Sequence, residues 1–171
     1  MMKSLTKGLI IAAVQVGLVA SLGAKLVYDR ATRPRVWALA APYDPNLPIR
    51  GRYVSLQLAV EPRGLRETKP GLVYQPSQSV ILSVDNDRLV AEANPQESDL
   101  HVRFIDRRGE KLAVLDQPVA FFITEQIPDP SFRPQDEQLW VEVTIPKKGP
   151  PRPIRLGVKK GDGPITPLEL R

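Results

Sequence analysis

An apolar run near the beginning of the chain limits what the rest can be. Residues 8–24 contain no charged side chain, and the run continues through residue 28 when Lys25 extends its ammonium group toward water. At a rise of about 1.5 Å per residue, the 17 uncharged residues span roughly 26 Å as a helix, the short end of the membrane-spanning range. We therefore predict a transmembrane anchor over residues 8–28.

Two other interpretations of this run stay open. Its basic start and apolar centre also fit a cleaved signal peptide, although residues 21–24 lack a good small-x-small cleavage triplet. A buried helix of a soluble protein is the second alternative. Within the run, Gly8, Gly17 and Gly23 would let the helix of a membrane partner approach closely.

The net charge of +5 is concentrated around this anchor. Residues 1–35 hold six basic groups and one acid, so residues 36–171 carry 18 groups of each sign and are neutral. A nucleic-acid-binding domain spreads its excess of Lys and Arg over the folded surface, so this distribution argues against nucleic acid as a partner. Basic groups on both sides of an apolar helix are typical of contact with lipid headgroups.

The chain is predicted to have four parts. These are a tail of residues 1–7, the anchor of residues 8–28, a basic juxtamembrane linker of residues 29–35, and a β-rich domain of residues 36–171. The positive charge on the two flanks of the anchor is nearly balanced, and a seven-residue tail is the usual start of a signal-anchor. We therefore expect the C-terminal domain to be exported.

From Pro34 onward the sequence has the pattern of short strands and turns. All 18 prolines fall in this part, and apolar residues recur at every second position. The strand candidates are residues 36–41, 52–60, 79–84, 88–93, 100–105, 111–115, 119–124, 139–145 and 154–159. In residues 52–60 the alternation places Val54, Leu56, Leu58 and Val60 on one face and Tyr53, Ser55 and Gln57 on the other. The fold class is predicted to be all-β, an antiparallel sandwich or partly open barrel.

Two hairpins are predicted within this part. Residues 79–84 and 88–93 are joined by the turn Asp85-Asn86-Asp87, and residues 100–105 and 111–115 are joined by residues 106–110. Gly109 is placed to adopt a positive φ in the second turn. The basic, proline-rich residues 147–160 are interpreted as an edge strand, with a recognition tail as the alternative.

Residues 44–58 carry the most specific pattern in the chain. They resemble the motif of the GDYXXLXY family, bacterial proteins with an N-terminal apolar segment and a small β-rich domain. The matching positions are Asp44, Pro45, Arg50, Gly51, Tyr53 and Leu56. Arg52 stands where the family has an acid and Leu58 where it has a tyrosine, and the charge reversal at Arg52 calls into question any role that needs a carboxylate there. The resemblance covers most of residues 36–158.

The resemblance implies a protein of the bacterial inner membrane, with one membrane span and a periplasmic domain, that assists a multi-spanning partner. The motif also has a purely structural interpretation, in which Asp44 forms an ion pair with Arg50 or Arg52 and pins a turn. In the alternative interpretation, the side chains of this segment form a polar binding surface. That candidate surface consists of Asp44, Arg50, Arg52 and Tyr53, beside Gly51 and Leu56.

The candidate catalytic residues in this sequence are weaker than the candidate binding residues. A signal-peptidase-like dyad would pair Ser55 with Lys69 or Lys111, whose pKa would have to be lowered by burial. A carboxylate pair for glycoside hydrolysis would draw on Asp85, Asp87, Glu92 or Asp99. The turn at residues 85–87 has oxygen ligands but lacks the rest of a calcium loop. His101 is expected to be an exposed strand residue, so we assign no catalytic residue, metal or cofactor.

We therefore predict a non-enzymatic, membrane-anchored β domain that acts as an accessory or binding subunit of an integral membrane partner. Two alternatives remain open, an exported hydrolase and a periplasmic ligand-binding module. A hydrolase requires a pocket with a strongly perturbed titratable group, whereas an interaction domain requires an exposed apolar or edge-strand surface. A ligand-binding module requires a pocket without the catalytic pair.

Overall fold

The computed structural model describes residues 2–42, 53–66, 76–96, 98–107, 109–124, 126–127, 129–130, 133–134 and 136–170. The chain consists of two compact units, Met1–Arg33 and Pro34–Arg171. The boundary between them falls inside the predicted basic linker.

The first unit is one helix, α1 (Met2–Thr32). Its segment Thr6–Thr32 is long and apolar enough to cross a membrane, and a signal sequence near an N-terminus shares these properties. The helix extends beyond the predicted end at residue 28, and its last turn is held by two local contacts. The Thr32 hydroxyl donates a 2.8 Å hydrogen bond to the carbonyl of Tyr28, and Arg33 forms a 3.3 Å ion pair with Asp29.

The second unit contains eleven strands in its described residues. They are β1 (Arg35–Pro42), β2 (Tyr53–Leu58), β3 (Glu61–Arg63), β4 (Gln78–Asp85), β5 (Arg88–Ala93), β6 (His101–Arg107), β7 (Glu110–Leu115), β8 (Val119–Phe122), β9 (Glu137–Thr144), β10 (Arg152–Lys160) and β11 (Thr166–Pro167). The nine strand candidates correspond to nine of these, while β3 and β11 were not predicted.

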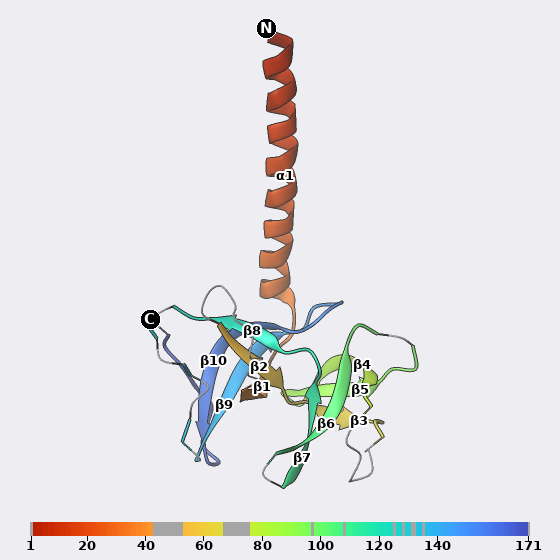
Figure 1. Cartoon of the computed structure of the whole chain (residues 1–171), viewed down its shortest axis with the longest axis vertical. Coiled ribbons are helices and arrows are strands. Elements are labelled where there is room, and N and C mark those ends of the chain that lie inside the picture. Colours follow the sequence, from red (N-terminus) through yellow and green to blue (C-terminus); the bar gives the residue numbers. More distant parts are fainter. Residues whose placement is uncertain are drawn as a thin grey trace. The chain divides into compact units, whose positions relative to one another are not determined.

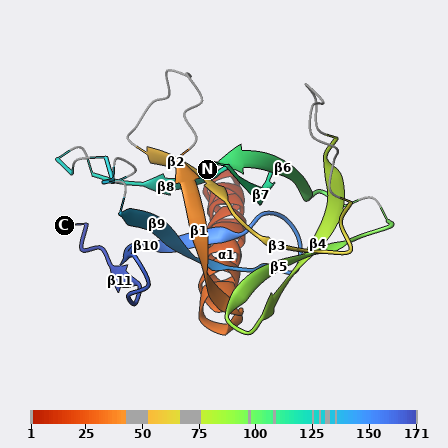
Figure 2. The same cartoon turned by 90° about the horizontal axis from the view of Figure 1, so that it is seen from below.

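The strands form two sheets that lie side by side in both views (Figures 1 and 2). One has six strands in the order β11-β10-β9-β1-β2-β8, and the other has five in the order β3-β5-β4-β6-β7. The described strand pairs are antiparallel except for β3 with β5. This confirms the predicted all-β fold with one N-terminal helix, and the curled sheets form a half-barrel.

The segment that follows β2 connects the two sheets. Ala59 forms an isolated bridge with Val114 of β7, and the amide of Val60 donates a 2.9 Å hydrogen bond to the carbonyl of Ala113. The chain then continues directly into β3, which pairs with β5. Because this short segment contacts both β7 and β5, it draws opposite sides of the five-stranded sheet together and curls it.

One apolar core fills the space between the sheets. It draws on both of them, and its fully buried side chains include Leu56, Leu58, Leu115, Leu156, Val80, Val102 and Val141. The predicted apolar face of residues 52–60 is confirmed, since all four of its members are buried. Gln57, predicted on the opposite face with Tyr53 and Ser55, is also buried. Its side chain donates a 3.1 Å hydrogen bond to the carbonyl of Leu115 on β7.

Both hairpins are confirmed, with shorter connections than predicted. In the first, Asp85 pairs with Arg88, so Asn86 and Asp87 alone form the turn, with φ of 49° and 58°. Two successive positive φ angles match the twist of the flanking strands, which explains the tight turn. In the second, strand pairing extends to residues 107 and 110, and Gly109 has the expected positive φ of 82°.

The predicted edge strand at residues 154–159 is an interior strand instead. β10 pairs with β9 from Arg152 to Lys160, and Gly157 and Val158 also pair with the two residues of β11. The alternation of apolar and polar residues did not indicate β11, because a strand of two residues is too short to show alternation. A slip in register between Pro153 and Arg155 accommodates the proline in the ladder.

Candidate functional site

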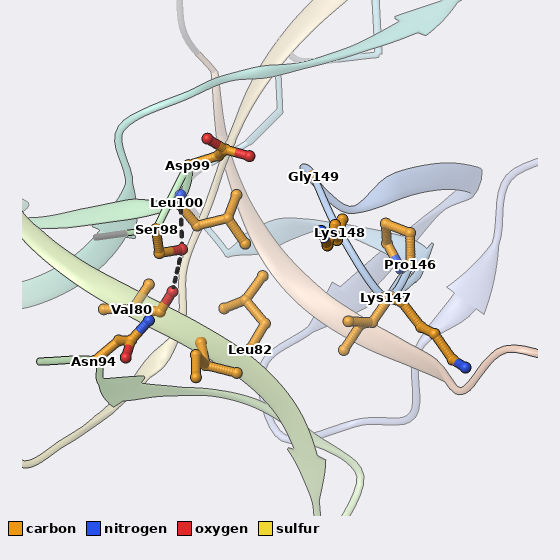
Figure 3. Close-up of a pocket in the computed structure, with 12 residues that line it drawn as sticks. Val80, Leu82, Asn94, Ser98, Asp99, Leu100, Pro146, Lys147, Lys148 and Gly149 are labelled. Carbon is orange, nitrogen blue, oxygen red and sulfur yellow. Dashed lines mark hydrogen bonds between the residues drawn. The ribbon is translucent and has the colours of Figure 1, made fainter. Parts of the chain in front are cut away.

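A pocket of about 310 Å³ opens between two parts of the β unit that are distant in sequence (Figure 3). Residues 80–82 of β4 form one wall together with Asn94, Ser98, Asp99 and Leu100 from the connection between β5 and β6, and residues 145–149 after β9 form the other. Figure 3 shows Leu82 and Leu100 facing the loop that carries Pro146 and Lys147. The volume of the pocket lies at the lower end of the range for small-molecule sites.

Hydrogen bonds around Ser98 fix the first wall. The Ser98 hydroxyl donates to the carbonyl of Val80 at 2.9 Å and accepts from the amide of Leu100 at 3.1 Å, as Figure 3 shows. The amide of Ser98 donates to the hydroxyl of Ser79 at 3.0 Å. The Ser98 hydroxyl is therefore a structural link, which leaves it poorly placed to act as a nucleophile.

The second wall is a loop with limited conformational freedom. It reads Pro146-Lys147-Lys148-Gly149-Pro150-Pro151, and Pro151 is fully buried. Gly149 has a φ of +86°, a region that side chains disfavour. Three prolines restrict the backbone around the two exposed lysines. The loop therefore holds Lys147 and Lys148 at the pocket with little entropy left to lose on binding.

The charge of the pocket is weakly positive. Its titratable lining residues are Asp99 on one wall and Lys147 and Lys148 on the other, which gives two positive charges, one negative charge and a net of +1. The remaining lining combines apolar side chains with Asn94 and Ser98. Such a lining suits an amphipathic ligand that carries an anionic group.

Most of the predicted motif surface lies outside the described residues. This applies to Asp44, Arg50, Gly51 and Arg52. Leu56 is fully buried, so it is a core residue. Leu58 is fully buried as well, so an apolar side chain suits the position where the GDYXXLXY pattern has a tyrosine.

Tyr53, the remaining motif residue, lies beside an exposed aromatic side chain. It begins β2 and pairs with Phe122 of β8, with ring centroids 6.1 Å apart and planes tilted by 56°. Phe122 is 75% exposed although it belongs to a strand. β8 ends the order of the six-stranded sheet among the described residues, so within that part of the chain this aromatic pair lies at a sheet edge. We call Tyr53 and Phe122 the aromatic edge.

The structure does not bring the predicted catalytic groups together. Ser55 lies opposite Ala120 in the six-stranded sheet, whereas Lys111 lies opposite Asp106 in the other sheet. Lys69 lies outside the described residues. His101 begins β6, and its backbone carbonyl accepts a hydrogen bond from the amide of Asp116.

Two of the predicted carboxylates, Asp85 and Glu92, lie around the same arginine, Arg63, and do not line the pocket. Asp85 forms a 2.5 Å ion pair with Arg63, Asp87 lies in the first hairpin turn, and Glu92 accepts from Ser83 at 3.5 Å. Asp99 alone among them lines the pocket. Within the described ranges, no three His, Asp or Glu side chains are grouped to hold a metal ion.

Shifted pKa values occur in exposed ion pairs away from the pocket. The hydrogen bond from Arg63 to Asp85 raises the pKa of that arginine. The hydrogen bond between Lys160 and Asp136 lowers the pKa of the aspartate and raises that of the lysine. These three shifts therefore belong to surface ion pairs and not to a catalytic arrangement.

Known proteins give no independent guide to this chain. Comparison with protein-family models, curated proteins and solved structures yielded no match. The GDYXXLXY resemblance therefore stays a prediction, and function has to be argued from the pocket and the aromatic edge. Sequence reasoning missed the pocket and Phe122, although it named Tyr53 as a candidate binding residue. The one local signal was the run of two lysines among prolines at residues 146–151.

Proposed function

We propose that this protein is a membrane-anchored β domain without enzymatic activity, which serves as an accessory or binding subunit of an integral membrane protein. The observation that carries the proposal is the aromatic edge. A strand at a sheet edge can pair with another chain, and the exposed ring of Phe122 beside Tyr53 would add aromatic contact area to such a pairing. A partner that adds a strand to β8 would cover Phe122 and satisfy the outer backbone groups of that strand.

The helical unit supports a partner in the same membrane. α1 is long enough to span a bilayer, and a span would confine the β domain to the membrane surface where an integral partner is exposed. Confinement raises the effective concentration of the two proteins, so a small contact surface can suffice. In this proposal the protein belongs to a bacterial inner membrane, with its β domain in the periplasm and a polytopic partner beside it.

Affinity purification from native membranes tests this proposal. The full-length tagged protein, extracted in mild detergent, is expected to recover a multi-spanning protein in stoichiometric amount. Phe122→Ser should reduce this recovery, whereas Glu110→Ser, which changes an exposed side chain of β7 in the other sheet, should not. Replacing α1 by an unrelated membrane helix shows whether the helix adds to the contact. Failure of the unaltered protein to recover any membrane protein would contradict the proposal.

The pocket favours a second candidate function, that of a ligand-binding module. It has an apolar wall, a positively charged loop and enough volume for a small group. The hydrolase alternative gains no comparable support, because Ser55 and Lys111 belong to different sheets. A change in the unfolding temperature of the intact protein with anionic amphiphiles, absent for neutral ones of equal chain length, would support the ligand-binding candidate.

A further inference from the structure

We infer that the pocket between residues 80–82 and 98–100 on one side and residues 145–149 on the other binds the headgroup of an anionic phospholipid from the membrane that holds α1. This inference rests on the proposed membrane anchor and on the ligand-binding candidate, and it does not depend on the partner protein. Four observations lead to it: chain connectivity, strand register, charge and the composition of the pocket.

Connectivity limits how far the β unit can lie from the end of the helix. Only Arg33 and Pro34 separate Thr32, the last residue of α1, from Arg35, the first residue of β1. Three peptide units extend to at most about 11 Å. The start of β1 therefore stays within that distance of the end of α1 at every possible angle between the two units.

The strand register places the loop of residues 145–149 at the end of the six-stranded sheet where β1 begins. Arg35 at the start of β1 pairs with Thr144 at the end of β9, which also pairs with Arg152 at the start of β10. The amide of Ile145 donates a 3.2 Å hydrogen bond to the carbonyl of Pro34. The loop that carries Lys147 and Lys148 thus begins beside the first residue after the helical unit.

Charge at this end of the sheet suits a phosphate group. The exposed basic side chains there are Arg35, Lys147, Lys148 and Arg152. Asp29 and Glu142, two acids nearby in the sequence, form ion pairs with Arg33 at 3.3 Å and with Arg155 at 2.7 Å. Lysines within reach of an anionic bilayer surface are each attracted to it. Asp99, on the opposite wall, opposes anion binding and so provides a direct test.

The composition of the pocket favours part of a lipid over a free ion. Leu82, Leu100 and Ile145 give the pocket an apolar component that a phosphate alone would leave exposed to water. The volume of about 310 Å³ accommodates a headgroup with the adjoining glycerol, while the acyl chains would stay in the bilayer. Because Pro146, Gly149 and the buried Pro151 hold the loop in shape, binding requires little reorganisation.

Hydrogen exchange of the full-length protein in lipid nanodiscs tests the inference. Discs of phosphatidylcholine alone are compared with discs of equal parts phosphatidylcholine and phosphatidylglycerol. We expect the amides of residues 147–149 to exchange more slowly with phosphatidylglycerol, by at least about fivefold, the effect of one basic residue at an anionic surface. Lys147→Gln with Lys148→Gln should abolish this difference, and Asp99→Asn should increase it.

A matched control removes the same charge at the other end of β10. Lys159→Gln with Lys160→Gln also deletes two lysines. Lys160 lies about 26 Å from Arg152, at the start of β10, when the strand rises by 3.3 Å per residue. This variant should keep the full effect of phosphatidylglycerol. Loss of the effect in both double variants would mean that net charge alone is responsible and would overturn the inference.

Further outcomes separate the inference from the proposals beneath it. Equal exchange of residues 147–149 in both kinds of disc, with the α1 amides protected, would overturn the lipid site and leave the anchor intact. Unprotected α1 amides would contradict the anchor itself. A third arm adds inorganic phosphate to discs of phosphatidylcholine. Equal protection in that arm would assign the site to a soluble phosphate and overturn a lipid source.

Discussion

The backbone amide of Ile145 donates a hydrogen bond of 3.2 Å to the carbonyl of Pro34. This bond joins the first residue of the β unit to the loop that forms one wall of the pocket, although 110 residues of sequence lie between them. Pro34 and Ile145 are the chain neighbours of Arg35 and Thr144, which pair in the ladder between β1 and β9. The hydrogen bond therefore continues that ladder by one position. The pocket loop is therefore fixed to Pro34, the first residue of the β unit.

The buried side chain of Gln57 is expected to stabilise the contact between the two sheets. Gln57→Leu keeps a side chain of similar size but leaves the carbonyl of Leu115 without its 3.1 Å hydrogen bond. Loss of one partner of a buried hydrogen bond costs about 1–3 kcal/mol. Urea unfolding followed by tryptophan fluorescence should show that loss in the free energy of unfolding. Gln138→Leu, at an exposed position of β9, should change it little, and equal effects of both changes would contradict the account.

Gly157 is predicted to be required for the packing of Trp37. A Cβ atom at position 157 would lie 2.8 Å from Cγ2 of Ile165 and 2.9 Å from the Trp37 ring. Gly157→Ala must therefore displace these side chains, at a cost of about 1–3 kcal/mol. The ring lies under Arg155, 5.4 Å from its guanidinium carbon, so its emission spectrum should change as well. Gly23→Ala, which would meet nothing within 4 Å, serves as the control.

The first hairpin turn offers a stabilising substitution. Asp87 adopts a φ of 58° at the second position of the turn, where glycine is preferred. Asp87→Gly should increase the free energy of unfolding by about 0.5–1 kcal/mol, because the strain of a side chain at positive φ is removed. Thermal unfolding of the two proteins measures the difference. A lower unfolding temperature for the variant would show that the Asp87 side chain has a stabilising contact.

The ion pair between Asp136 and Lys160 should make stability depend on pH. The pair has a 3.0 Å separation, which lowers the pKa of the aspartate and raises that of the lysine. The contribution of the aspartate is therefore present above its unfolded pKa and lost as the pH falls through its folded pKa. The contribution of the lysine is present below its unfolded pKa and lost as the pH rises through its folded pKa.

Comparison of the native protein with Lys160→Gln checks this pH dependence. At neutral pH the substitution should lower the urea midpoint, because it removes the ion pair. This decrease should become smaller at high salt and disappear below the folded pKa of Asp136. An effect that is unchanged in acid would assign the stabilisation to the aliphatic part of the lysine.

Features set by neighbours in the chain could be predicted from the sequence. The hairpin at Asn86 follows from turn chemistry, and the buried face of β2 follows from alternation. Gln57 departs from the alternation because β7 covers the second face of β2 at that point. That cover arises from the curl of the sheets, for which residues 53–60 carry no local signal.

The two candidate sites depend on contacts between distant segments. The pocket forms only where residues 80–100 meet residues 145–149, and no periodicity encodes that meeting. Phe122 falls within the predicted strand 119–124, and its 75% exposure follows from alternation, because it shares a face with exposed Ala120 opposite buried Val119. The place of β8 at the end of the described strand order is the part that alternation does not encode. Strand order is a tertiary property, so the sequence could indicate the strand but not its open edge.

Photo-crosslinking in intact membranes tests the subunit proposal most directly. A photoreactive amino acid is placed at position 122 and, as a control, at position 110, where Glu110 is also exposed but begins β7 at the end of the other sheet. The account predicts that position 122 gives an adduct with a multi-spanning membrane protein and that position 110 does not. No adduct from position 122, or the same adduct from both positions, would contradict the account.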